Sequence, residues 1–107
     1  MRVLLDECVP RACATTLSAT VTRQFAKMGW AGVKNGQLLR LAATEFDALL
    51  TVDRNLEYQQ NFAGVSIAVI VVHAPSNDIT VLRPFMPAVV AALAGAKPGM
   101  IIPIRGQ

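Results

Sequence analysis

Residues 67–72 have the sequence Ile67-Ala68-Val69-Ile70-Val71-Val72, an apolar run without one polar side chain. A strand with one face in water alternates apolar and polar residues, so this run predicts a strand that is covered on both faces. Shorter apolar runs occupy residues 3–5, 48–52 and 100–104, and a stretch rich in β-branched residues occupies 19–25. These five segments are the predicted strands.

Helical patterns separate the predicted strands. We expect helices over residues 10–18, 35–45 and 56–60, and a last helix over residues 81–93, which begins irregularly because it contains prolines. The alternation of strands and helices predicts an α/β fold, a single three-layer αβα domain over residues 1–107. Its five-stranded, mainly parallel sheet has the expected order 2-1-3-4-5, which brings the first and third strands together where the helices leave to opposite faces.

The composition excludes several classes of protein. The chain has 107 residues, of which 53% are hydrophobic and 16% charged, so one folded domain is expected and disorder is not. No apolar run approaches the roughly 20 residues of a membrane span, and no secretory leader is expected. Cys8 and Cys13 are too few for a disulfide framework, which favours a reduced, cytoplasmic protein. The net charge of +3 is a mild preference for anionic partners.

Acidic residues follow two of the predicted strands. Asp6 and Glu7 come after the first strand, and Asp53 and Glu57 come after the third. In the expected strand order these segments share one crevice, where two carboxylates about 4 Å apart repel by roughly 4 kcal/mol at an effective dielectric near 20. A divalent cation relieves such repulsion, and all-oxygen ligands suit Mg²⁺ or Mn²⁺. In the equally open alternative, aspartates at strand ends cap the next turn and Glu7 faces water.

Three stretches together resemble the small PIN-like proteins of the Mut7-C / DUF5615 type: residues 3–7, residues 28–32 and residues 49–56. The resemblance covers nearly the whole chain, and Thr-x-Asp-Arg-Asn after a buried strand is its most specific part. It implies a PIN fold and a ribonuclease dependent on Mg²⁺ or Mn²⁺, often predicted to be the toxin of a toxin–antitoxin pair. Asp6 and Asp53 match the metal-binding aspartates, with Glu7 or Glu57 as a third ligand or as the group that orients water.

Neutral residues stand at two positions where PIN nucleases usually carry acids. Gln37 lies in the region of one such acid and Asn55 at the position of another. The resemblance therefore implies a weakly held metal and slow or absent catalysis. A PIN-like protein that acts by binding a protein partner remains the alternative.

Basic residues lie in the segments that follow the carboxyl ends of the first three predicted strands. Arg11, Lys34 and Arg54 are candidate contacts to RNA phosphates, and salt bridges to the neighbouring acids are their structural alternative. His73 follows the fourth strand and is a candidate general base or phosphate contact. A phospho-accepting receiver domain has similar acids, but it needs a hydroxyl at the position of His73 and a lysine at that of Arg105, so it is disfavoured.

Three further expectations concern residues outside the acidic crevice. The last helix is apolar almost all round, which predicts a partner subunit or a homodimer on its outer face. Asp78 is expected to be a turn or cap residue. The Cys8 thiol lies beside acids in the sequence, so its pKa is expected to be raised and the thiol to be a poor nucleophile.

Overall fold

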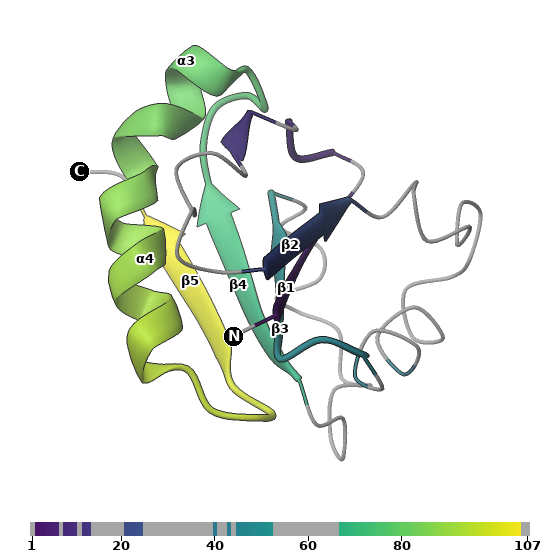
Figure 1. Cartoon of the computed structure of the whole chain (residues 1–107). Coiled ribbons are helices and arrows are strands. Elements are labelled where there is room, and N and C mark those ends of the chain that lie inside the picture. Colours follow the sequence, from purple (N-terminus) through teal and green to yellow (C-terminus); the bar gives the residue numbers. More distant parts are fainter. Residues whose placement is uncertain are drawn as a thin grey trace.

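A computed structural model describes residues 2–6, 8–10, 12–13, 21–24, 40, 43, 45–52 and 67–105 of the chain. Its strands are β1 (Arg2–Leu5), β2 (Val21–Gln24), β3 (Ala48–Thr51), β4 (Ala68–His73) and β5 (Ile101–Arg105). They form one sheet in the order β2-β1-β3-β4-β5, and each neighbouring pair is parallel (Figure 1). The predicted α/β class with a parallel sheet is confirmed, and the strand order is the one expected.

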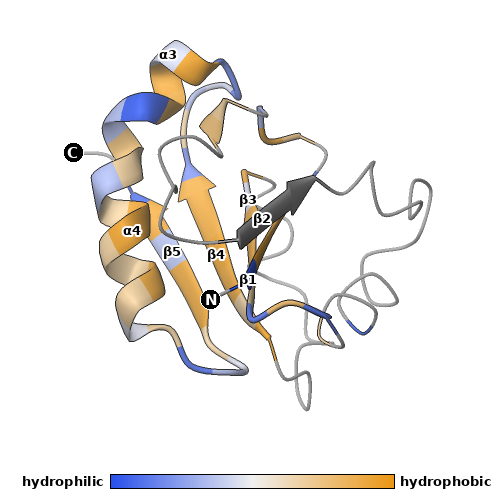
Figure 2. Ribbon diagram, in the orientation of Figure 1, coloured by the Kyte–Doolittle hydropathy of each residue, from blue (hydrophilic) through white to orange (hydrophobic). Residues whose placement is uncertain are grey.

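The strands in the middle of the sheet are buried on both faces. Val3 and Leu5 belong to the core cluster on the face that carries the C-terminal helices. Successive strand residues point to opposite faces, so Leu4, Leu49 and Val71 point the other way, and their exposed fraction is also 0%. The hydrophobic colour runs along β3 and β4 in Figure 2. The absence of alternation in these strands therefore has the predicted cause.

The helices expected to cover the second face fall largely outside the described residues. Cys13, Arg40, Ala43 and Glu45 are helical, as predicted from the segments 10–18 and 35–45. The expected helix over residues 56–60 lies wholly outside the described part of the chain.

Helical structure covers the first face in three consecutive pieces. They are α3 (Ile79–Leu82), the 3-10 turn η4 (Arg83–Phe85) and α4 (Met86–Gly95). Pro84 and Pro87 lie in the first positions of η4 and α4, where a missing N–H costs little. The predicted irregular start of the last helix is confirmed, although helical structure begins at Ile79, before the expected residue 81.

Side chains on opposite sides of α4 differ in burial. Met86, Val89 and Leu93 are buried against the sheet, whereas Val90 is 47% exposed. The outer face of the helix is therefore apolar and open to solvent within the described part of the chain. Among these described residues, no helix has both the length and the apolar character needed to cross a bilayer.

Asp78 is the N-cap of α3, as expected. Its Oδ1 accepts hydrogen bonds from the Thr80 backbone N–H at 2.8 Å and from the Thr80 hydroxyl at 2.7 Å. The hydroxyl and the backbone N–H of Thr80 both stabilise the charged carboxylate, so they lower the pKa of Asp78 below its ordinary value.

Two adjacent valines of α4 test how much burial contributes to the free energy of unfolding. Val89 is 0% exposed and Val90 is 47% exposed, one residue further along the same helix. We expect Val89→Ala to lower the free energy of unfolding by about 2 kcal/mol, because it removes buried methyl groups and leaves a cavity. Val90→Ala is the matched control, with an expected change within about 0.5 kcal/mol. Urea unfolding of both variants measures the difference, and equal losses would contradict the packing described for α4.

The Asp78 cap should give a pH-dependent contribution to stability. Because the folded pKa is depressed, the contribution is present above the unfolded pKa, near 3.8, and is lost as the pH falls through the folded pKa. We expect Asp78→Ala to lower the melting temperature at pH 7, and the gap from the wild type to narrow when melting is repeated below about pH 4. A gap that stays constant down to pH 2 would show that the charge has no role in the cap.

Candidate functional site

The edge of the sheet between β1 and β3 is where the chain changes direction. β1 lies between β2 and β3, so the strand order reverses its direction at β1. In sheets of this kind, ligands bind beyond the carboxyl ends of the strands at this point. Asp6 directly follows β1, and Thr51 is the last residue of β3.

The backbone N–H and the backbone carbonyl of Asp6 both form hydrogen bonds. Its N–H donates to the carbonyl of Leu50 at 3.0 Å, and its own carbonyl accepts from the N–H of Val9 at 2.9 Å. The side chain is half-buried, and its Oδ2 accepts a hydrogen bond from the Thr51 hydroxyl at 2.7 Å. The Asp6 carboxylate is therefore oriented by the end of the neighbouring strand.

Cys8 lies against the same two side chains. Its Sγ is 3.6 Å from Asp6 Oδ2 and 3.7 Å from the Thr51 hydroxyl. Burial is the largest effect and raises the pKa of the Cys8 thiol. The hydrogen bond from the Val52 N–H is the second and lowers this pKa, and the negative charge of Asp6 comes third and raises it, so that the net direction is upward. The direction expected from the sequence is confirmed, but burial precedes the charge as its cause. The thiol is protonated at neutral pH and is a poor nucleophile.

Asn77 connects a second loop to this cluster. Its Nδ2 donates to the Cys8 carbonyl at 3.0 Å, across 69 residues of sequence. The loop after β4 is thereby tied to the turn after β1. Sequence reasoning assigned no such role to Asn77, because an exposed asparagine in a turn carries no signal of its partner.

Thr51 begins the Thr-x-Asp-Arg-Asn stretch of the resemblance, but the sequence assigned its hydroxyl no role in the site. It is 0% exposed and is the one polar residue of β3. A threonine is also a common strand former, so its hydroxyl did not stand out. The available signal was its place at the end of a strand, next to the predicted acidic crevice.

His73 and Arg105 end the next two strands on the same edge. They are register partners, so their side chains leave the same face of the sheet. His73 is half-buried and Arg105 is exposed. The position of His73 at the rim, expected from the sequence, is confirmed.

Most of the predicted site residues fall outside the described part of the chain. Asp6 alone of the predicted acids is described, and it lies where the sequence placed it. The predicted residues that lie outside the described ranges are Glu7, Arg11, Lys34, Asp53, Arg54 and Glu57, together with the neutral Gln37 and Asn55.

The described donors suit a hard cation but do not complete a site. Asp6 supplies a carboxylate at the strand end, the kind of ligand that Mg²⁺ and Mn²⁺ prefer. Within the described ranges, no three His, Cys, Asp or Glu side chains form a group that could hold a metal ion. A divalent ion at Asp6 therefore requires further ligands from Glu7, Asp53 or Glu57.

Comparisons with known proteins gave no significant match: no family model, no curated protein and no solved structure matches this chain.

A double-mutant cycle measures the bond between Thr51 and Asp6. We expect Thr51→Val and Asp6→Ala to show a coupling of about 1–2 kcal/mol in the free energy of unfolding, because each removes the same charge-assisted hydrogen bond. The control cycle pairs Thr51→Val with Asp47→Ala, an exposed acid at the opposite edge, and should be additive within about 0.5 kcal/mol. Equal coupling in both cycles would contradict a specific role for the bond.

Proposed function

We propose that this chain is a metal-dependent ribonuclease with a PIN-like fold. The observation that supports it most directly is the oriented, half-buried carboxylate of Asp6 at the point where the strand order reverses. The PIN-like assignment itself rests on the resemblance of residues 3–7, 28–32 and 49–56.

The geometry of β3 supports Asp53 as the second ligand. Asp53 comes two residues after Thr51 in the sequence, and Thr51 touches the Asp6 carboxylate. Two residues of extended chain span about 7 Å at most. The connection is therefore short enough for both carboxylates to hold one cation.

The proposal gives each residue a defined task. Asp6 and Asp53 hold a Mg²⁺ or Mn²⁺ ion, Glu57 is a further ligand, and Glu7 orients the attacking water. The bound ion supplies hydroxide at neutral pH and neutralises charge on the phosphodiester. The Thr51 hydroxyl fixes the direction of the Asp6 carboxylate. With Gln37 and Asn55 neutral, the ion is held weakly.

Basic residues complete the proposed interface with RNA. Arg11, Lys34 and Arg54 contact phosphates and position the strand without reading its sequence. A role as the toxin of a toxin–antitoxin pair belongs to the same proposal and rests on the resemblance alone. The cytoplasm is the proposed location, and the two free cysteines fit a reducing compartment.

Cleavage of a labelled RNA strand with Mn²⁺ and with EDTA tests the nuclease. We expect the wild type to cleave with Mn²⁺ and to stop with EDTA. Asp6→Asn should lose about 100-fold or more, since removing a ligand costs at least as much as removing a residue that supports one. Asp53→Asn should lose a similar factor.

Asp47→Asn is the matched control for this experiment. It makes the same chemical change in an exposed acid at the amino edge of the sheet. It should leave cleavage within about twofold of the wild type, and thermal melting checks that all variants fold. Cleavage that persists in EDTA, or in the Asp6→Asn variant, would contradict the proposal.

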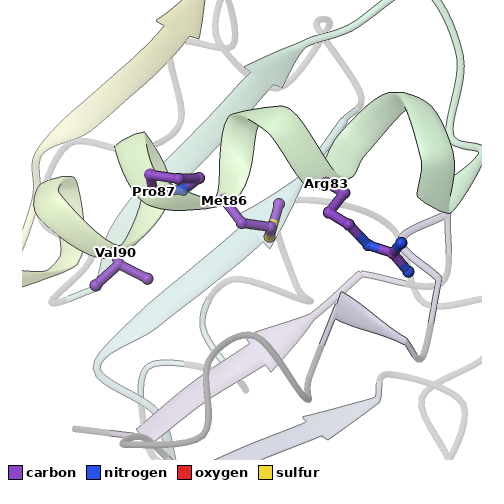
Figure 3. Close-up of a pocket in the computed structure, with 4 residues that line it drawn as sticks. All are labelled: Arg83, Met86, Pro87 and Val90. Atoms are coloured by element: carbon purple, nitrogen blue, oxygen red, sulfur yellow. The ribbon is translucent and has the colours of Figure 1, made fainter.

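A second candidate function, binding of a protein partner, is favoured by the outer face of α4. A depression of about 530 Å³ beside α4 is lined, among the described residues, by Arg83, Met86, Pro87 and Val90 (Figure 3). Pro87 and Val90 are both apolar and exposed, and exposed apolar surface often marks an interface. We propose that a second copy of the chain covers this face and forms a homodimer.

Sedimentation velocity tests the homodimer. We expect the wild type to sediment as a dimer at micromolar concentration. Val90→Glu and Val90→Lys should both shift it to monomer, because either charge would be buried without a partner. A wild-type monomer at all concentrations, or loss of the dimer with only one sign of charge, would contradict an apolar contact through α4.

A further inference from the structure

Polar and charged side chains end four adjacent strands on one face of the sheet. Val3, Leu5 and their counterparts in β3, β4 and β5 face the C-terminal helices. By alternation, the positions at the carboxyl ends belong to the opposite face. Thr51, His73 and Arg105 are the last residues of β3, β4 and β5, and Asp6 directly follows β1. We call these four residues the edge row.

The strand register fixes the direction of the edge row. Thr51 is paired with Val71, and His73, two residues further along β4, is paired with Arg105. The basic end of the row therefore lies about 7 Å further along the strand direction than the end at Asp6. Neighbouring strands are about 4.8 Å apart, so β5 lies about 10 Å from β3 across the sheet. The row runs diagonally outward from the proposed cation to Arg105.

Along the edge row, the side chains change from acidic at Asp6 to basic at His73 and Arg105. The Asp6 end carries a carboxylate, which repels a phosphate unless a cation lies between them. At the other end, the Arg105 guanidinium and the His73 imidazole donate hydrogen bonds and suit a phosphodiester directly. A single RNA strand meets both requirements when one phosphate is at the metal and another, a few nucleotides further along the strand, is at Arg105.

We propose that His73 and Arg105 form a phosphate-binding subsite, which holds the backbone of single-stranded RNA that extends from Asp6 across the ends of β3, β4 and β5. This inference deepens the proposed function and rests on it. It gives the substrate strand a direction across the sheet, towards the edge strand β5 (Figure 1). Its ligand is the phosphodiester backbone, so it predicts little dependence on base sequence.

Fluorescence anisotropy of a labelled oligouridine of about ten nucleotides tests the subsite. This length lies within the range that grooves for single-stranded nucleic acid hold. All proteins carry Asp6→Asn, so that no cleavage interferes. Removing one phosphate contact should reduce the slope of log K against log salt by about 0.7. Arg105→Gln should therefore weaken binding about 5- to 10-fold at about 50 mM KCl. Arg105→Lys should keep the charge and most of the slope.

Lys97→Gln is the matched control. Lys97 is exposed and precedes β5 at the opposite edge of the sheet, so its substitution makes the same charge change away from the row. It should weaken binding less than about twofold. Thermal melting of each variant checks that it folds.

Each remaining outcome contradicts the subsite. Equal losses of affinity for Arg105→Gln and Lys97→Gln would show a general charge effect. An Asp6→Asn protein that binds no oligouridine would show that this surface does not bind an RNA strand. A peptide of about ten glutamates that binds as tightly, with the same dependence on Arg105, would assign the surface to acidic proteins. Inorganic phosphate that competes far better than chloride at equal ionic strength would assign it to free phosphate.

The experiments distinguish failure of the nuclease proposal from failure of the subsite proposal. The nuclease is judged by cleavage in wild-type protein with Mn²⁺, and the subsite by the contrast between Arg105 and Lys97 in binding. Cleavage without that contrast overturns the subsite alone. The contrast without cleavage overturns the nuclease and retains a site for the RNA backbone.

Discussion

Burial of the middle strands on both faces of the sheet is the constraint on which the rest of the structure depends. Leu4, Leu49 and Val71 are 0% exposed although they point away from the C-terminal helices. In such a sheet, polar side chains have room only where strands end, because an unpaired polar group within it costs free energy. Thr51 follows this rule: it is fully buried, and its hydroxyl donates to Asp6 at the edge. The place of the site is therefore a consequence of the apolar strands.

The two edges of the sheet use their charged residues differently. At the amino edge, the Arg2 backbone N–H donates to Asp47 at 2.8 Å, and the Arg2 guanidinium lies 5.4 Å from the centre of the Phe46 ring. These contacts join neighbouring segments and need no ligand. At the carboxyl edge, Asp6 is held by Thr51 and the turn beyond it is tied down through Asn77. The carboxyl edge thus has an oriented carboxylate supported from two other segments, which is the arrangement that a binding site requires.

The sequence predicted the strands better than the contacts between them. Largely apolar runs located β3 and β4 within a residue at each end, and the prolines predicted the break between α3 and α4. The Asp6 position was predicted because it needs only the strand order. Thr51 and Asn77 were missed because their bonds to Asp6 and Cys8 span 45 and 69 residues and depend on register and loop shape. Burial of Cys8, the main cause of its raised pKa, likewise depends on packing that no local pattern encodes.

The neutral residues at two expected acid positions affect metal and RNA in opposite ways. Gln37 and Asn55 remove ligands, which weakens the hold on a divalent cation. In the proposed nuclease they also leave less negative charge to act on the phosphates, so repulsion of the RNA backbone would be smaller. The chain as a whole has 10 basic against 7 acidic residues, which adds to the same effect. Under the proposed function, binding of a strand through Arg105 and His73 would therefore depend less on the cation than cleavage does, and it would survive in a protein whose catalysis is slow.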